Sequence, residues 1–324
     1  MRKIVLLLMA AGLFFPAILR ADVVFEISEG LSSDGLKTRV ERQISRLLTA
    51  VNDAAKSGRP VNFSGIDIDD MASFSITQLW ANVHFCTCDD EIVTRALRRI
   101  SAGRLKGYEV RDIEIEMLPL NESYTGAEIQ DICIEFDTSG KITDFNLTLG
   151  MTTYVQFMRE GSELNDLDRR MQILHYVEQF RTAYNKRDLD FLETVFSDDA
   201  LIITGRVVQR GRSDINLPPE IQYTRQSKRQ YLDNLKKNAF DKNKNAWLNI
   251  VFDDIRIKRH GSKPNYYGVT LIQHWNASTY SDKGILFLVW DFTDEDKPKI
   301  HVRTWQPMET PKEKIITLND FRLP

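Results

Sequence analysis

Side chains that could bind or react with a ligand gather near the end of the chain. Arg303 shares one face of a predicted strand with His301 and Trp305, because alternate residues of a strand point to the same side. Trp290 lies on the strand expected beside it. A guanidinium next to indole rings can either stack on them or hold an anionic ligand. Both interpretations stay open, and Arg303, Trp290 and Trp305 are candidate ligand-binding residues.

A second set of candidates lies on the strand predicted over 266–278. His274 and Trp275 are adjacent and point to opposite faces, and the pair Tyr266 and Tyr267 offers one ring to each face. His274 is a candidate acid or base, since an imidazole titrates near neutral pH, and the alternative is a histidine that only packs in the sheet. Tyr266 and Trp275 are candidate ligand contacts, with core packing as the alternative.

Sequence motifs with well-defined chemistry are missing from the chain. It has no nucleophile elbow, Walker loop, dinucleotide-binding glycine motif or zinc-protease motif. Cys86, Cys88 and Cys133 lack the paired spacing of a zinc site, so we expect no metal and no cofactor. In an oxidising compartment Cys133 could pair with Cys86 or Cys88, and the alternative is three free thiols.

The elements that must position these residues are clearest in the second half. Apolar residues at helical spacing predict a helix over 171–184, and Asp188 is a suitable N-cap for a short helix that follows. The other expected elements are a bent strand or hairpin over 201–208, a helix over 226–240, and strands over 247–258, 266–278, 284–292 and 299–305. Helices followed by a run of strands favour an α+β fold.

The first half follows the same scheme less clearly. Apolar residues from Val40 to Val51 predict a long helix, and a second helix is predicted over 90–100. The predicted strands are 109–118, 127–136 and 141–149. The short polar stretch 161–166 is the expected linker between the halves.

The two halves also share short sequence matches in the same order. The matched segments are Thr49–Asn52 with Thr182–Asn185, Phe63-Ser64 with Phe196-Ser197, Leu97–Arg99 with Leu235–Lys237, Asp112-Ile113 with Asp254-Ile255, and Glu135-Phe136 with Asp291-Phe292. Each match is short, but their common order favours two copies of one fold.

The N-terminus has the features of a secretory signal peptide. Arg2 and Lys3 precede an apolar run that Pro16 ends, and Ala21 offers a small residue for cleavage. The run is too short to span a bilayer, which takes about 20 residues. We therefore expect residues 1–21 to be removed, the protein to be exported to the periplasm or the medium, and no integral membrane segment.

The charge balance bears on the partners of the protein. The chain has 43 basic and 46 acidic residues, and removal of residues 1–21 would make it more acidic by taking away basic residues only. A large nucleic-acid surface is therefore not expected. The remaining partner classes are a small apolar or anionic ligand, another exported protein, and a second copy of the chain in a homodimer.

Three segments near the middle of the chain carry a family resemblance, namely Val177–Asn185, Asp188–Leu192 and Phe196–Ala200. They resemble the opening of nuclear transport factor 2-like domains, whose relatives include SnoaL-like cyclases and ketosteroid isomerases. The resemblance covers roughly 166–307 and extends weakly to 23–157. The sequence also resembles exported proteins of Bacteroidales in which such domains occur in tandem.

This resemblance implies two tandem cone-like domains, each with helices packed on a curved antiparallel sheet that can enclose an apolar ligand. The implied division is a degenerate domain at 22–160, a second domain at 161–308 and a tail at 309–324. Catalytic members of the family use carboxylates, tyrosines or histidines inside the cone. On that basis Asp199 is a candidate general base, although the proline beside the isomerase base is missing, and Tyr184 is a candidate cone residue.

Two classes of function follow from these observations. The first is an exported, non-catalytic module that binds a ligand or a protein. The alternative is an isomerase, dehydratase or hydrolase of small molecules that acts in the pocket of the second domain, with Asp199 or His274 as the proton-transfer group. The fold does not decide between them, because one fold carries many functions.

Overall fold

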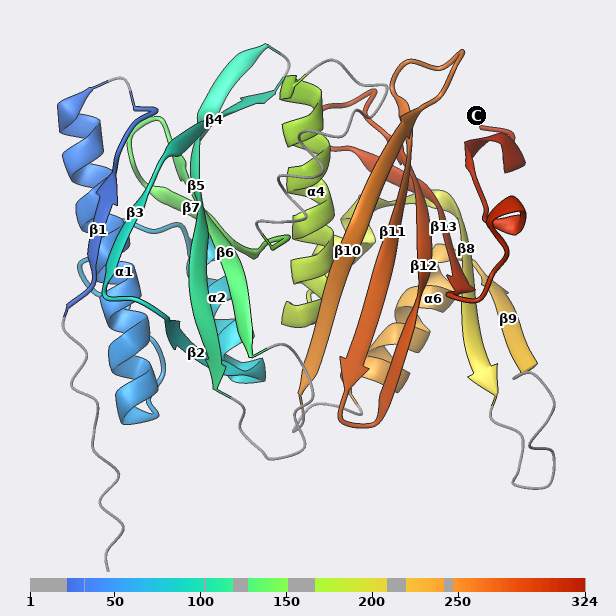
Figure 1. Cartoon of the computed structure of the whole chain (residues 1–324), viewed down its shortest axis with the longest axis horizontal. Helices are drawn as coiled ribbons and strands as arrows, with labels where there is room; N and C mark the ends of the chain where they lie inside the picture. Colours follow the sequence, from blue (N-terminus) through green and yellow to red (C-terminus); the bar gives the residue numbers. More distant parts are fainter. Residues whose placement is uncertain are drawn as a thin grey trace, which may run out of the picture.

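The computed structural model describes residues 22–31, 33–101, 103–118, 128–150, 167–208, 220–241 and 247–323. The expected signal peptide and the expected linker at 161–166 lie outside these residues. Within them the chain forms two halves, each with helices packed on a curved sheet (Figure 1). The predicted α+β class with two cone-like units is confirmed, whereas the domain boundaries stay predictions.

The first half is built on a sheet in which β5 pairs with β6 on one side and with β2 and β4 on the other. Its elements are β1 (Val24–Ile27), α1 (Asp34–Ser57), α2 (Asp70–Asn82), β2 (His84–Thr87), β3 (Glu91–Thr94), β4 (Ala96–Ser101), β5 (Arg104–Leu118), β6 (Ile129–Asp137) and β7 (Ile142–Leu147). The predicted apolar face of α1 is buried in the core of this half.

The helix predicted over 90–100 is wrong, because this segment forms the strands β3 and β4. Ile92, Val93 and Thr94 are consecutive β-branched residues, which favour a strand over a helix. The second helix of this half lies earlier, in α2, where the side chain of Asp69 caps the N-terminus by accepting from the backbone N–H of Met71 at 2.8 Å.

The second half carries a six-stranded sheet in the order β10-β11-β12-β13-β8-β9. Its elements are α4 (Leu167–Lys186), α5 (Leu189–Val195), β8 (Phe196–Val208), β9 (Glu220–Gln226), α6 (Lys228–Leu235), the π-helix η1 (Lys236–Phe240), β10 (Leu248–Arg259), β11 (Tyr266–Ala277), β12 (Tyr280–Asp291) and β13 (Lys299–Pro307). The sheet is antiparallel except where β8 runs parallel to β13. Asp188 caps α5 as predicted.

The structure supports two of the sequence matches between the halves. Oδ1 of Asn52 on α1 accepts a hydrogen bond from the backbone N–H of Thr87 at 2.9 Å. Oδ1 of Asn185 on α4 accepts one from the backbone N–H of Ile250 at the same distance. Asp112 and Asp254 both adopt left-handed backbone conformations, with φ of 63° and 46°, where the strand register shifts.

Two further sequence matches between the halves do not mark structurally equivalent positions. Residues 97–99 belong to a strand, whereas 235–237 belong to the end of α6 and to η1. The strand β6, which ends near Glu135, pairs directly with the strand that bears Asp112. The strand that ends at Asp291 pairs with β11 and β13, not with the strand that bears Asp254.

The tail packs on the second half. It forms two short 3-10 turns, η2 (Lys312–Lys314) and η3 (Leu318–Asp320). Leu318 packs against Phe287, Val289 and Val302, and the ring of Phe321 stacks on Phe287 at 5.9 Å. These residues cover the sheet face opposite the core of the second half.

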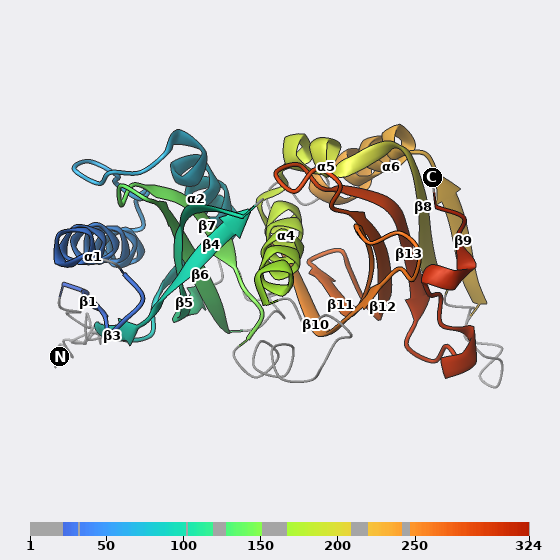
Figure 2. The ribbon, with the colours of Figure 1, turned by 90° about the horizontal axis from the view of Figure 1, so that it is seen from above.

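The helix α4 lies between the two sheets, as both views show (Figures 1 and 2). One side of it packs in the core of the second half and the other contacts β4 and β7 of the first half. In the part of the chain that the structure describes, no helix has both the length and the apolar character needed to cross a membrane.

Candidate functional site

A cavity of about 430 Å³ lies between the sheet of the second half and α6. Strand β13 contributes Arg303 and Trp305, and β11 contributes Gln273 and Trp275. The remaining lining residues come from β8, from β12 with the turn before it, and from α6 and η1; they include Gly205, Tyr231, Tyr280 and Asp282. The cavity therefore combines two indoles, one buried cation and one carboxyl group.

The indole of Trp305 forms the floor of this cavity because two neighbouring strands carry glycine beneath it. A Cβ atom on Gly205 would lie 2.2 Å from Cε3 of Trp305, and one on Gly284 would lie 2.4 Å from its Nε1. Both distances are far inside van der Waals contact. The glycines are needed here for space and not for an unusual backbone conformation.

Arg303 is the buried cation of the cavity, with only 3% of its surface exposed. Its Nη2 donates to Oε1 of Gln273 at 3.2 Å, and its guanidinium lies 5.2 Å from the ring centre of Tyr231. Its Nε and Nη1 have no hydrogen-bond partner among the described residues, and no described carboxylate lies within 4.0 Å of it. Burial opposes its charge, but the nearby oxygens of Tyr231 and Tyr184 keep its pKa above the ordinary value.

Two tyrosines, Tyr184 and Tyr231, lie close to the guanidinium of Arg303. The hydroxyl groups of Tyr184 and Tyr231 lie 2.6 Å apart, and Tyr184 is 1% exposed. Burial raises the pKa of Tyr184 well above its ordinary value, so this phenol stays neutral. Tyr184 contacts Trp275 edge to face but does not line the cavity.

Asp282 is the only carboxyl group among the described lining residues of the cavity. Its Oδ2 accepts a hydrogen bond from the Tyr280 hydroxyl at 2.5 Å, and its Oδ1 is buried without a hydrogen-bond partner in the described structure. Burial raises its pKa, although the hydrogen bond from Tyr280 and the charge of Arg303 act in the opposite direction. Burial therefore shifts the titration of Asp282 towards higher pH.

The two candidate proton-transfer residues lie outside the cavity and apart from each other. The side chain of Asp199 is 74% exposed and accepts from the Ser197 hydroxyl at 2.8 Å, which lowers its pKa. His274 places Nε2 2.9 Å from Oδ2 of Asp253 and does not line the cavity either. The His274 hydrogen bond lowers the pKa of Asp253.

The structure brings together three of the six candidate ligand contacts, namely Trp275, Arg303 and Trp305. Trp290 is fully buried in the aromatic core, and Tyr266 lies beside His301 with 5.7 Å between the ring centres. Together with Tyr184, these residues do not line the cavity.

Sequence reasoning missed Asp282, Tyr280 and Tyr231. The strand was expected to begin only at Gly284, so Tyr280 and Asp282 lay outside it. Gln273 could have been found, since it alternates onto the same face as Trp275.

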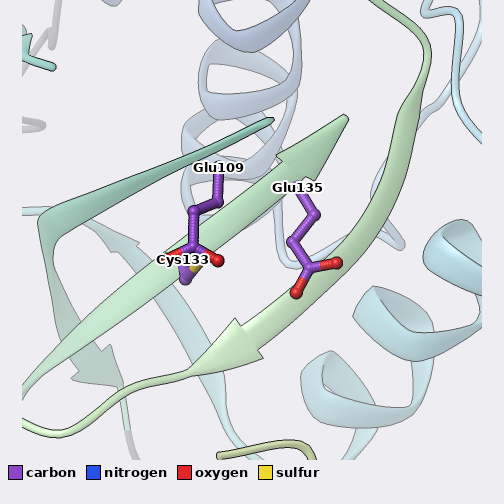
Figure 3. A group of neighbouring side chains, drawn as sticks. All are labelled: Glu109, Cys133 and Glu135. Atoms are coloured by element: carbon purple, nitrogen blue, oxygen red, sulfur yellow. The ribbon is translucent and has the colours of Figure 1, made fainter. Parts of the chain in front are cut away.

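A separate group of metal-ligand types lies in the first half. The ligand atoms of Glu109, Cys133 and Glu135 lie within 4.8 Å of one another, and all three residues are buried (Figure 3). Arginines already accompany the carboxylates: Arg111 lies 3.2 Å from Glu109 and Arg99 lies 2.7 Å from Glu135. Burial also raises the pKa of the Cys133 thiol, so this group is a neutralised ion-pair cluster.

The same cluster joins the first half to α4. Arg111 donates from Nη1 to Oε2 of Glu178 at 2.8 Å, and Nδ1 of His175 lies 2.6 Å from Oε1 of Glu135. Buried ion pairs of this kind specify an arrangement more than they add to stability. The described structure shows no disulfide bond at Cys86, Cys88 or Cys133.

Solved structures similar to this chain include nuclear transport factor 2-like proteins. One from Cytophaga hutchinsonii is 17% identical, with a TM-score of 0.31, and the match covers 44% of this chain and 100% of that chain. One from Shewanella oneidensis is 16% identical, with a TM-score of 0.30, over 42% of this chain and 98% of that chain.

Bd1075 from Bdellovibrio bacteriovorus is 17% identical with a TM-score of 0.32, and the match covers 44% of this chain. The match covers 42% of the Bd1075 chain, so this chain spans less than half of its length. No family model and no curated protein matches the chain.

Proposed function

We propose that this protein is a non-catalytic binding module whose second half holds a small organic anion with a flat apolar body. The observation that carries the proposal is the buried guanidinium of Arg303, which has unpartnered N–H groups and no described carboxylate within 4.0 Å. A buried charge without a counterion is costly. An anionic group of a ligand would supply the missing partner and accept charge-assisted hydrogen bonds.

The shape and lining of the cavity support a flat ligand. Trp305 and Trp275 offer broad apolar surfaces, and the volume of about 430 Å³ falls in the range of small-molecule sites, roughly 300–1,000 Å³. Aromatic rings stack favourably on indoles. An aromatic carboxylate is therefore the simplest ligand that matches both the cation and the floor.

The positions of the titratable groups favour binding over catalysis. Acid–base catalysis needs a proton acceptor within hydrogen-bond reach of the bound substrate. Asp199 and His274 do not line the cavity, and burial raises the pKa of its one described carboxyl group, Asp282. Turnover of a small-molecule substrate that disappears in Asp199→Ala or His274→Ala would favour the enzyme alternative.

Export belongs to the same proposal and rests on the N-terminal pattern of Arg2, Lys3 and the apolar run that follows. The expected mature protein begins at Asp22 and accumulates outside the cytoplasm. Cell fractionation followed by N-terminal sequencing tests this, and an intact N-terminus on cytoplasmic protein contradicts it.

The binding proposal is tested with matched ligands and one decisive variant. Benzoate, phenylacetate and naphthoate are titrated by calorimetry beside their neutral amides. We expect the carboxylates to bind at least about 10-fold more tightly, because a charge-assisted hydrogen bond contributes about 1.5–3 kcal/mol.

Arg303→Met should remove this preference, whereas Arg256→Met, which changes an exposed arginine, should keep it. Equal binding of acids and amides, or unchanged binding to Arg303→Met, would refute the proposal. So would the absence of binding by every member of the series.

A further inference from the structure

A second, smaller cavity of about 160 Å³ lies where the two halves meet, and we refer to it as the interface cavity. Its walls come from α2 and β7 of the first half and from α4 and α5 of the second, which lie next to one another in the middle of the molecule (Figure 2). Its lining includes Ser75, Asp144, Asn146 and Lys186. Its described lining residues differ from those around Arg303, so the two sites are separate.

Lys186, in the last turn of α4, brings a buried cation to the interface cavity. It is 9% exposed, and its Nζ donates to Oγ of Ser75 on α2 at 2.7 Å. An ammonium has three N–H groups, and Ser75 is the one acceptor that the described residues offer them. No described carboxylate lies within 4.0 Å of Nζ. A buried ammonium without a counterion in contact is costly.

Asp144 on β7 brings the opposite charge from the first half. Its carboxylate accepts from Nε2 of Gln179 and from the backbone N–H of Phe145, each at 2.8 Å. Burial opposes its charge, but the charge of Lys186 and the hydrogen bonds keep its pKa below the ordinary value. The two charges therefore influence each other without forming an ion pair of 4.0 Å or less. The other carboxyl group of the cavity, on Asp188, caps α5.

Asn146 adds a buried acceptor beside Asp144. The two residues are two positions apart on β7, so their side chains lie on the same face of the strand. Asn146 is 2% exposed and lines the interface cavity, and its Oδ1 has no hydrogen-bond partner among the described residues. Buried oxygens of this kind normally accept a hydrogen bond. The cavity thus offers acceptors from β7 and an ammonium from α4.

We propose that the interface cavity binds a small amino acid in its zwitterionic form. The carboxylate of the ligand pairs with Lys186, and its ammonium donates to Asn146 and Asp144. One carbon joins the two charged groups of an α-amino acid, which suits a cation and an anion that line one small space without touching. At about 30 Å³ per water molecule, the cavity holds about five waters, which is the size of alanine. A bound ligand of this kind bridges the two halves.

Three ligands with one carbon skeleton test this inference: L-alanine, propionate and ethylamine. Propionate lacks the ammonium of alanine, and ethylamine lacks its carboxylate. Isothermal titration calorimetry at neutral pH measures the affinity of each ligand for the full chain. We expect alanine to bind at least about 10-fold more tightly than either of the others, because each of them leaves one buried charged or polar group without a partner.

Two variants assign the two preferences to opposite sides of the cavity. Lys186→Met should remove the preference for alanine over ethylamine and keep the preference over propionate. Asp144→Asn should reduce the preference over propionate and keep the preference over ethylamine. The preference that each variant retains shows that the cavity still forms. Lys37→Met, which changes a lysine on the surface of α1, is the matched control and should keep both preferences.

Several outcomes overturn the inference. These are an absence of alanine binding, propionate or ethylamine that binds wild-type protein as tightly as alanine, and both preferences surviving in both variants. Alanine binding that disappears in Arg303→Met also overturns it, because alanine then occupies the other cavity. None of these results bears on the proposed function, which the benzoate series tests at Arg303.

Discussion

The protonation of Asp282 makes the stability of the ligand-free protein depend on pH. Burial raises the pKa of Asp282 in the folded state, so the folded protein binds this proton more tightly than the unfolded chain does. Its contribution to stability is therefore fully present below the unfolded pKa and is lost as the pH rises through the folded pKa.

Asp282→Asn should make the ligand-free protein more stable than wild type at neutral pH, since an amide has no proton to lose. Below about pH 4 the two proteins should have similar stability, because an aspartate is then protonated in the unfolded chain as well. Urea unfolding midpoints measured across this pH range test the sign. A variant that is less stable than wild type at neutral pH would contradict it.

The space under Trp305 gives a second prediction for single residues. Gly205→Ala places a Cβ inside the indole, so we expect a loss of about 1–3 kcal/mol of unfolding free energy and weaker ligand binding. Gly261→Ala is the matched control, since nothing lies within 4 Å of a Cβ there, and should change stability by less than about 0.5 kcal/mol. Denaturant unfolding that finds equal effects would show that the indole can move.

At the residue level the sequence could predict only what strand alternation predicts. It grouped Arg303 with Trp305 correctly because both lie two residues apart on β13. It could not place Trp290, whose burial depends on Tyr176 and Phe180 from the distant helix α4. Asp282 was not predicted as a lining residue, because the sequence around a polar residue near a turn does not indicate that it will line a cavity.

Among the elements, α4 is the one that both halves bury. Its apolar face was predicted from helical spacing, and Leu174, Val177 and Phe180 are buried in the core. Its polar face is buried too: Glu178 and Arg181 are each 2% exposed. An amphipathic pattern predicts that such a face meets water, and only the first half, which covers it, reverses this expectation.

Glu178→Gln should destabilise the protein strongly because it leaves the buried Arg111 with one carboxylate fewer. Breaking a buried pair from one side costs about 3–5 kcal/mol. Arg256→Gln, which breaks an exposed pair with Asp254, should cost less than about 1 kcal/mol. Equal losses in chemical unfolding would mean that the contact between Arg111 and Glu178 adds little to holding the halves together.

On the scale of the whole molecule, the two cores are not separated by position in the sequence. Trp247 directly precedes β10 of the second half, yet it is 3% exposed and belongs to the hydrophobic cluster of the first half. Asn82 of the first half in turn donates to the backbone oxygen of Leu248 at 2.7 Å. The sequence predicted two units from the repeat, but it had no signal for this exchange.

Trp247→Ala should therefore weaken the first half, with a loss of about 3–5 kcal/mol for a buried tryptophan. Hydrogen exchange should report faster opening of the amides of β5 and β6. Phe321→Ala, on the outer face of the second half, is the control and should leave these amides unchanged. Unaltered exchange in β5 and β6 of Trp247→Ala would show that the first core is independent of this side chain.

The two glycines that flank Trp305 also constrain how descendants of this protein can diverge. Neither glycine can gain a side chain while the ring of Trp305 stays in place, because a Cβ at 205 or 284 would overlap that ring. Lineages that keep the tryptophan should keep both glycines. Lineages that acquire a side chain at 205 or 284 should have lost the tryptophan first, and they should bind ligands of a different shape.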